Sequence, residues 1–441
     1  MHSSKMKDRV LSLICLLVLL VVTELTLGYL LEPESYSWSY NYDVKQLEKA
    51  DEDVDMILIG ASRVLRTFEP GIFEEELGIS RCLNAGTSMQ LLSGSYYHLK
   101  YLLTKFDPEY VVLGVTWNSL LRDDSTQAKL IVDDRMGFMS PTKLMYEAQV
   151  FSMDEKSYLL DSWRFRDNFK PSAIINNIKS RVYLKNHDYI GYNAGYGSYY
   201  AGMGFVYSHQ SVMTGNATTD GIQVFNTEEF DLELLSYLDK IVALCQEEGI
   251  TLYLVSAPMT TAYMYSISNY QDAIDYFEEY AKNNGLLYHN INYLKDRESF
   301  LPDTLMHDST HVNGEGAKII SRKYAQVLKS VWDGEDTAQY FYKDFDEYAT
   351  AVERIVSVSA EIETQEDRLI VHVSSLQNED MIPEYELLLS VDGGEYESIS
   401  AYSKQTEYEL AIPQGDSYTI RVQARQIGNE QAYEAYQEYQ Y

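Results

Sequence analysis

The chain has few cysteines, few histidines and little positive charge. Three cysteines and eight histidines occur in 441 residues. Neither type is spaced like a set of zinc ligands, so the sequence predicts no metal site, and it carries no motif that calls for a cofactor. Cys15 lies within a long apolar run. Cys82 and Cys245 could pair in an oxidising compartment, but two buried free thiols are favoured.

Basic residues are outnumbered almost two to one by acidic residues. Lys and Arg total 35, Asp and Glu total 67, and the formal net charge is -32. A polyanion would be repelled, so nucleic acid is excluded as a partner, and broad adhesion to anionic lipid is excluded as well. The length predicts two or three folded units, and a hydrophobic content of 45% is enough to bury a sizeable interior.

One long apolar run stands near the N-terminus. Residues 10–31 read "VLSLICLLVLLVVTELTLGYLL", with Glu24 as the one charge, and Lys5, Lys7 and Arg9 precede them. A helix of this length spans a bilayer core of ~30 Å. We therefore expect a cytoplasmic tail (1–9), a single transmembrane anchor (10–31) and an ectodomain outside the cytoplasm. A cleaved signal peptide is the alternative, but the run is long and no small-x-small site follows it.

Between residues 54 and 333, apolar runs alternate with amphipathic segments. Residues 32–53 are polar and aromatic and are predicted to be a spacer. After them, short apolar runs predict five strands, at 54–60, 81–86, 110–115, 250–258 and 286–292. Helical patterns lie at 88–106, 226–249, 270–285 and 313–332. This order predicts an α/β domain over 54–333, a three-layer sandwich around a parallel five-stranded sheet.

Two segments depart from this rhythm. Residues 120–225 form a long insertion after the third strand, with a centre rich in glycine and tyrosine, "GYNAGYGSYYAGMGF". Loops of this length are usually functional or disordered. From about residue 350 to 441, short alternating runs separated by turn signals predict a small antiparallel β-sandwich of the fibronectin type III kind.

Polar residues follow several of the predicted strands. Ser62 follows the first strand, Gly86 the second and Asn118 the third, and Asp308 and His311 follow the fifth. The carboxyl ends of parallel strands meet at one edge of a sheet, where ligands bind. These residues are therefore expected to converge there.

The residue types suit nucleophilic catalysis. A serine hydroxyl needs a base to remove its proton, and His311 is the candidate base for Ser62. Asp308, three residues before the histidine, can orient the imidazole and stabilise its charged form. The backbone N–H groups of Ser62 and Gly86 and the amide of Asn118 are candidate donors to an oxyanion.

The segments "ILIGASR", "LNAG", "VTWN" and "DSTH" resemble the four sequence blocks of the SGNH/GDSL hydrolase superfamily. The resemblance covers about residues 52–333 and implies a flavodoxin-like sandwich with Ser62, Gly86, Asn118 and the Asp308/His311 pair in the site. Two blocks depart from the common pattern. The first reads "GAS" rather than "GDS", and the third has "TWNS" where many members carry a glycine, with an aspartate after the asparagine.

The anchor and ectodomain look most like extracytoplasmic SGNH-like proteins of cell-envelope acylation, those of teichoic-acid D-alanylation and of alginate or peptidoglycan O-acetylation. The resemblance implies a serine esterase or O-acyltransferase acting on a cell-envelope polysaccharide or glycan ester. It also implies a membrane-bound O-acyltransferase as partner. The other function class is a catalytically inactive glycan-binding or scaffold protein, in which Ser62 would only cap a helix.

Other residues near these blocks allow two readings. Arg63 and Arg66 could bind an anionic group of the substrate or lie on a solvated helix face, and Trp117 is a further candidate for substrate binding. His289 lies within a predicted strand and is expected to be packed. His307 adjoins Asp308 but lacks the three-residue spacing of His311.

Overall fold

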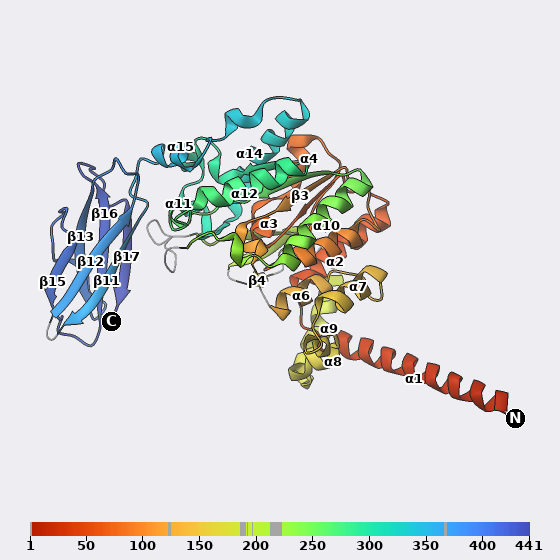
Figure 1. The fold of residues 1–441 in the computed structure, drawn as a ribbon. Helices are drawn as coiled ribbons and strands as arrows, with labels where there is room; N and C mark the ends of the chain where they lie inside the picture. The colour runs from red at the N-terminus through yellow and green to blue at the C-terminus, as the bar shows by residue number, and fades with distance from the viewer. Residues whose placement is uncertain are drawn as a thin grey trace.

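The computed structural model describes residues 2–441, apart from 122–124, 186–190, 192, 196, 212–222 and 366–367. Figure 1 shows three parts: an N-terminal helix that projects outward, a central α/β domain, and a C-terminal domain built from strands. The predicted α/β class, with C-terminal antiparallel sheets and an apolar N-terminal helix, is confirmed.

The α/β domain is organised around a parallel sheet with strand order β2-β1-β3-β7-β8. Its strands are β1 (Met56–Ile59), β2 (Cys82–Asn84), β3 (Tyr110–Gly114), β7 (Thr251–Ser256) and β8 (Leu287–Asn290). All four residues of β1 are buried, because helices cover both faces of the sheet. Alternate residues of each strand enter two separate cores: Ile57 and Ile59 belong to one, Met56 and Leu58 to the other.

Helices from distant parts of the chain form the two outer layers. The first core includes side chains of α5 (Leu92–Leu102) and α10 (Leu232–Glu248), and the second includes α3 (Ser62–Thr67), α4 (Pro70–Leu77) and α14 (Gly314–Trp332). Helix α12 (Tyr270–Asn283) packs near β8. The side chain of Asp231 caps α10, which ends at Gly249 in a left-handed conformation. Cys82 and Cys245 are both buried and free.

The expected spacer is a packed helix instead. Helix α2 (Tyr36–Ala50) occupies most of residues 32–53, and its Tyr40, Val44 and Leu47 are buried in the first core. Buried polar groups also hold it, because the Tyr40 hydroxyl hydrogen-bonds with His98 of α5 at 3.1 Å. This segment therefore belongs to the α/β domain, and the prediction of a spacer is corrected.

The insertion carries ordered structure of its own. It contains α6 (Thr126–Asp133), α7 (Pro141–Val150), α8 (Asp161–Arg164), α9 (Pro171–Lys185) and a small antiparallel sheet of β4 (Asn193–Gly195), β5 (Ser198–Gly202) and β6 (Phe205–Ser208). The side chains of Tyr200 and Phe205 are fully or almost fully buried. The N–H of Asn84 at the end of β2 donates to the Met203 carbonyl at 2.9 Å, so this sheet is attached to the central one.

The C-terminal domain is a β-sandwich of two antiparallel sheets. One has the order β11-β12-β15 and the other β14-β13-β16-β17. Their strands are β11 (Ser357–Gln365), β12 (Arg368–Leu376), β13 (Pro383–Val391), β14 (Glu397–Ser398), β15 (Glu407–Ala411), β16 (Tyr418–Gln426) and β17 (Ala435–Gln440). Side chains from both sheets share one core. Helix α15 (Phe345–Thr350) stands between this domain and α14.

Helix α1 (His2–Leu31) is long and apolar. Its stretch Arg9–Leu31 has a mean hydropathy of 2.7 and is not buried by the rest of the chain. Length and composition allow it to cross a membrane, and a signal sequence would have the same properties. Figure 1 shows it leaving the domain beside α8 and α9.

Gly204 tests how the insertion is attached. Its φ is +86°, and a Cβ at this position would overlap the carbonyl of Asn84. Gly195 also has a positive φ, +80°, but has open space around it. We expect Gly204→Ala to lower the free energy of unfolding by more than Gly195→Ala. At Gly195 the only expected loss is the strain of placing an alanine in a left-handed conformation, about 1–2 kcal/mol. Urea unfolding of the solubilised chain measures both, and equal losses would show that the attachment at Asn84 contributes nothing.

Candidate active site

Ser62 stands at the corner between β1 and α3. It is the first residue of α3, and Ala61 is the extended residue before it. The backbone N–H at the first position of a helix has no carbonyl partner within that helix. The corner therefore presents the side chain and the N–H of one serine at the carboxyl edge of the sheet.

Asp308 and His311 lie opposite each other in a small hairpin. Strands β9 (Met306–Asp308) and β10 (His311–Val312) pair antiparallel, and these two residues are register partners. The two residues between them form the turn. The spacing of three in "DSTH" is therefore the spacing that a two-residue turn needs to place the two side chains side by side.

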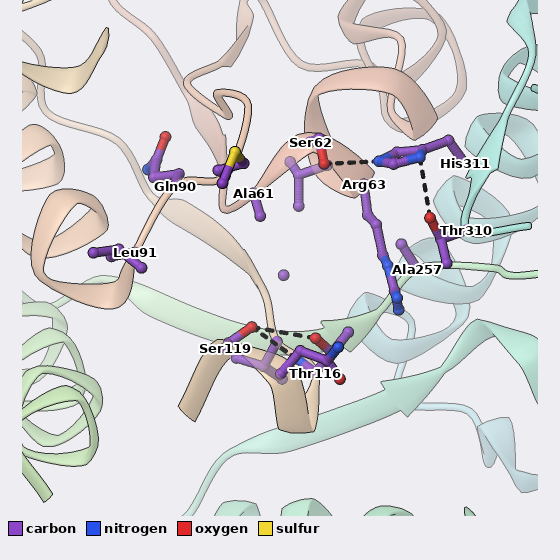
Figure 2. Close-up of a pocket in the computed structure, with 15 residues that line it drawn as sticks. Ala61, Ser62, Arg63, Gln90, Leu91, Thr116, Ser119, Ala257, Thr310 and His311 are labelled. Carbon is purple, nitrogen blue, oxygen red and sulfur yellow. Dashed lines mark hydrogen bonds between the residues drawn. The ribbon is translucent and has the colours of Figure 1, made fainter. Parts of the chain in front are cut away.

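Three side chains form a hydrogen-bonded chain. His311 Nε2 lies 2.7 Å from Ser62 Oγ, and His311 Nδ1 lies 2.8 and 2.9 Å from the two carboxylate oxygens of Asp308. Figure 2 shows the first of these contacts at one end of a pocket. The structure thus brings together the serine, histidine and aspartate that the sequence analysis singled out.

The charge of Asp308 determines the protonation of the imidazole. The hydrogen bond from His311, together with the backbone N–H of Thr310 at 2.8 Å, outweighs the effect of burial and lowers the pKa of Asp308 well below its usual value. An ionised carboxylate only accepts hydrogen bonds, so His311 Nδ1 must donate to it. In the neutral imidazole, Nε2 then carries no proton and can accept from the Ser62 hydroxyl, the arrangement that a general base requires.

A cavity of about 290 Å³ opens at the serine. Its wall combines backbone and side chains from the ends of several strands. The lining residues include Ser62, Arg63, Met89, Gln90, Leu91, Thr116, Asn118, Ser119, Ala257, Thr310 and His311. Figure 2 shows Thr116 and Ser119 across the cavity from Ser62 and His311. The space can hold an acyl group or a small part of a larger substrate.

The candidate oxyanion donors do not all reach the cavity. The backbone of Ser62 and the exposed Asn118 line it. The N–H of Gly86 instead donates to the side-chain oxygen of Asn84 at 3.0 Å in a buried contact. Asn84 in turn donates to the carbonyls of Val64 and Phe68, which ties the second strand to α3. Gly86 therefore stabilises the loop, and its prediction as an oxyanion donor is corrected.

The three candidate substrate-binding residues separate in space. Arg63 lines the cavity, and its guanidinium lies 5.8 Å from the ring centre of Tyr263. Arg66 points elsewhere and donates to Ser198 of β5 at 2.9 Å. Burial lowers the pKa of both arginines, and neither lies on a solvated helix face. Trp117 packs against the first core, so among these three Arg63 is the residue that can meet a ligand in this cavity.

The two other histidines are structural. His289 is buried beside the Tyr324 hydroxyl at 3.3 Å, and burial lowers its pKa to about 4. His307 Nδ1 lies 2.7 Å from Ser208 Oγ of β6, a contact between the insertion and the β9–β10 hairpin. Sequence reasoning missed this contact because Ser208 comes from the insertion, which carries no recognisable motif. It also missed Gln90 and Thr310 in the cavity wall, although Thr310 lies within the "DSTH" segment and hydrogen-bonds to Asp308.

Comparisons with known proteins give only distant likenesses. No family model matches the chain, and no curated protein matches its sequence. Among solved structures, a candidate acylhydrolase from Bacteroides fragilis aligns with 67% of this chain and 98% of its own, at 10% identity and a TM-score of 0.31. The spore cortex lytic enzyme SleM of Clostridium perfringens aligns with 78% of this chain and 92% of its own, at 11% identity and a TM-score of 0.17.

Covalent labelling tests Ser62 as the nucleophile. A fluorophosphonate probe should label the full-length, detergent-solubilised chain, because His311 can take the proton of the attacking hydroxyl. Ser62→Ala should abolish labelling, whereas Ser119→Ala should not, since Ser119 lines the same cavity but hydrogen-bonds with Thr116 and not, among the described residues, with a histidine. Labelling that survives in Ser62→Ala would assign the chemistry to another residue.

Proposed function

We propose that the protein is a membrane-anchored, extracytoplasmic serine esterase or O-acyltransferase of SGNH type. It forms an acyl-serine intermediate at Ser62 and acts on acyl esters of a cell-envelope polysaccharide or exopolysaccharide. The observation that carries the proposal is the chain of hydrogen bonds from Ser62 through His311 to Asp308 at the wall of a cavity. A serine that only capped a helix would not need a base oriented by a carboxylate.

The reaction follows from this geometry. Ser62 Oγ attacks the carbonyl carbon of the ester while its proton moves to His311 Nε2, and the oxyanion accepts hydrogen bonds from the Ser62 N–H and from Asn118. The C–O bond to the alcohol breaks, and the alcohol leaves with the proton from His311. A glycan hydroxyl or water then attacks the acyl-serine and gives its proton to His311. The bond between the acyl carbon and Ser62 Oγ breaks, and His311 returns the proton to Ser62 Oγ. Asp308 stays ionised throughout and stabilises the imidazolium.

The acyl donor and acceptor follow from the proposed location. An enzyme outside the cytoplasm has no access to cytoplasmic activated acyl groups, so a membrane-bound O-acyltransferase that exports the acyl group is the proposed partner. Transfer and hydrolysis use the same three residues, and the acceptor present at the cavity decides between them. Arg63 at the cavity wall provides a positive charge for an anionic group near the ester.

The first test is turnover of a simple acetyl ester by full-length variants. Ser62→Ala and His311→Ala should each lose several orders of magnitude, and the double variant should be little worse, because the two residues act as a unit. Asp308→Asn should also be severe, since an amide would favour the wrong tautomer. Asn118→Ala should retain activity, with a loss of ~10²–10³ at most, the effect of one oxyanion donor.

Two outcomes would count against parts of this account. Near-normal turnover by His311→Ala would remove the triad. If Asn118→Ala turns over the ester as fast as wild type, the triad stands, but Asn118 is not an oxyanion donor. If correctly folded wild-type protein neither turns over an ester nor reacts with the fluorophosphonate, the scaffold function becomes the better description.

Topology gives an independent test. Lys5, Lys7 and Arg9 should hold the N-terminus in the cytoplasm, so everything after α1 should lie outside. A reporter that is active only outside the cytoplasm, fused after Tyr441, should be active. A cytoplasmic reporter at the same position should be silent. The reverse pattern would contradict the localisation.

A further inference from the structure

The C-terminal turns of α1 are held by α8 and α9 of the insertion. Asn168 and Asn177 donate to the carbonyls of Leu31 and Leu30 at 2.9 and 3.0 Å, and Arg181 donates to the carbonyl of Tyr29 at 3.0 Å. The last carbonyls of a helix lack partners within it, so these side chains supply the missing donors. The segment from residue 160 to 185, here called the α8–α9 segment, therefore surrounds the end of the anchor.

The contacts extend well into the apolar stretch. The backbone N–H of Ser162 donates to the carboxylate of Glu24 at 2.9 Å, and the side chain of Asp161 lies where a Cβ on Gly28 would be. Glu24 stands seven residues before Leu31, which is ~10 Å along a helix axis. If α1 spans the membrane, as proposed above, the start of α8 lies at the level of Glu24, on the membrane side of Leu31, and therefore reaches the membrane interface.

The surface of the α8–α9 segment has the composition of an interfacial element. Trp163, Phe169 and Ile175 are 50%, 68% and 50% exposed. The segment contains six Lys or Arg residues and two Asp or Glu residues, a formal charge of +4 in a chain of -32. Arg164 and Arg181 pair with Asp134 and Glu32 outside the segment, so the exposed basic side chains that the structure describes there are Arg166, Lys170 and Lys179. Aromatic and basic residues are favoured at the membrane interface, and basic clusters are attracted to anionic lipids.

We propose that the α8–α9 segment lies in the outer membrane–water interface. Trp163, Phe169 and Ile175 insert among the lipids, and Lys170 and Lys179 face anionic headgroups. Two observations select lipid as the occupant of this surface: it is continuous with the membrane anchor, and its charge is opposite to that of the rest of the chain. The excess of negative charge elsewhere then confines lipid contact to this one segment.

Fluorescence quenching in vesicles tests the placement. The full chain with Cys15→Ser and Phe169→Cys is labelled with an environment-sensitive dye and reconstituted into phosphatidylcholine–phosphatidylglycerol vesicles. The remaining cysteines, Cys82 and Cys245, are buried. Nitroxide-labelled lipids should quench this dye several-fold more strongly than the same dye at Ile427→Cys, an exposed position in the C-terminal β-sandwich. Aqueous iodide should show the reverse preference.

A second pair of variants tests the charge. The dye at Phe169→Cys should be quenched more strongly by nitroxide-labelled lipids in phosphatidylcholine–phosphatidylglycerol vesicles than in vesicles of phosphatidylcholine alone. In the labelled protein, Lys170→Glu with Lys179→Glu should remove this difference. Lys343→Glu with Lys404→Glu makes the same change of charge on exposed lysines outside the segment and should leave the quenching unchanged. Equal effects of the two pairs would overturn the role of local charge.

The outcomes separate this inference from the proposed function. A dye on the native Cys15 reports whether α1 is in lipid, and fluorophosphonate labelling in the same vesicles reports the state of Ser62. If the Cys15 dye is quenched by lipid while the Phe169→Cys dye is open to iodide, the anchor stands and the interfacial placement is overturned. The exposed apolar side chains of the α8–α9 segment would then be assigned to contact with a protein partner. Loss of fluorophosphonate labelling alone would overturn only the enzymatic proposal.

Discussion

The hydrogen bond between His311 and Ser62 joins residues 249 positions apart, and the arrangement of the α/β domain has to keep its two ends together. One end is the first residue of α3, which is fixed by the fully buried β1. The other end is a hairpin of two short strands, β9 and β10, joined by a two-residue turn. A hairpin this short has little stability by itself. It is held by α14, whose first turn follows directly after β10, and by the bond from His307 to Ser208. The insertion therefore supports the hairpin that carries His311 as well as covering the sheet.

Much of the fold was predictable because its signals are local. Continuous apolar runs marked the five parallel strands, and Gly249 ends α10 where the helical pattern was predicted to end. The helix begins later than the predicted residue 226, because Asp231 is its N-terminal cap. The positions of Ser62, Asp308 and His311 followed from one rule, that strand ends meet at one edge. The "DSTH" spacing was also informative, because the turn that brings Asp308 to His311 lies within four residues.

The parts that sequence reasoning missed depend on contacts between distant segments. In α2, Ser37 and Ser39 are buried alongside Tyr40. Polar residues therefore occupy inward positions, and the spacing of apolar residues that would predict an amphipathic helix is interrupted. Gly86 has the right place in the chain for an oxyanion donor, but the side chain of Asn84 takes its N–H, and no spacing reveals that competition.

Only residues 32–35 separate α1 from α2, and even these are engaged, since the Trp38 indole donates to Glu32 at 2.8 Å. Because α2 is part of the core, the α/β domain has no flexible linker between it and α1. For a chain anchored by α1, the height and tilt of the cavity above the bilayer are then constant. A domain on a flexible linker searches a volume set by the length of that linker. If the proposed function is correct, the cavity of this protein would meet only substrates that reach a thin layer at a set distance from the lipid. Polymer strands farther out would have to bend or diffuse to that layer to be modified.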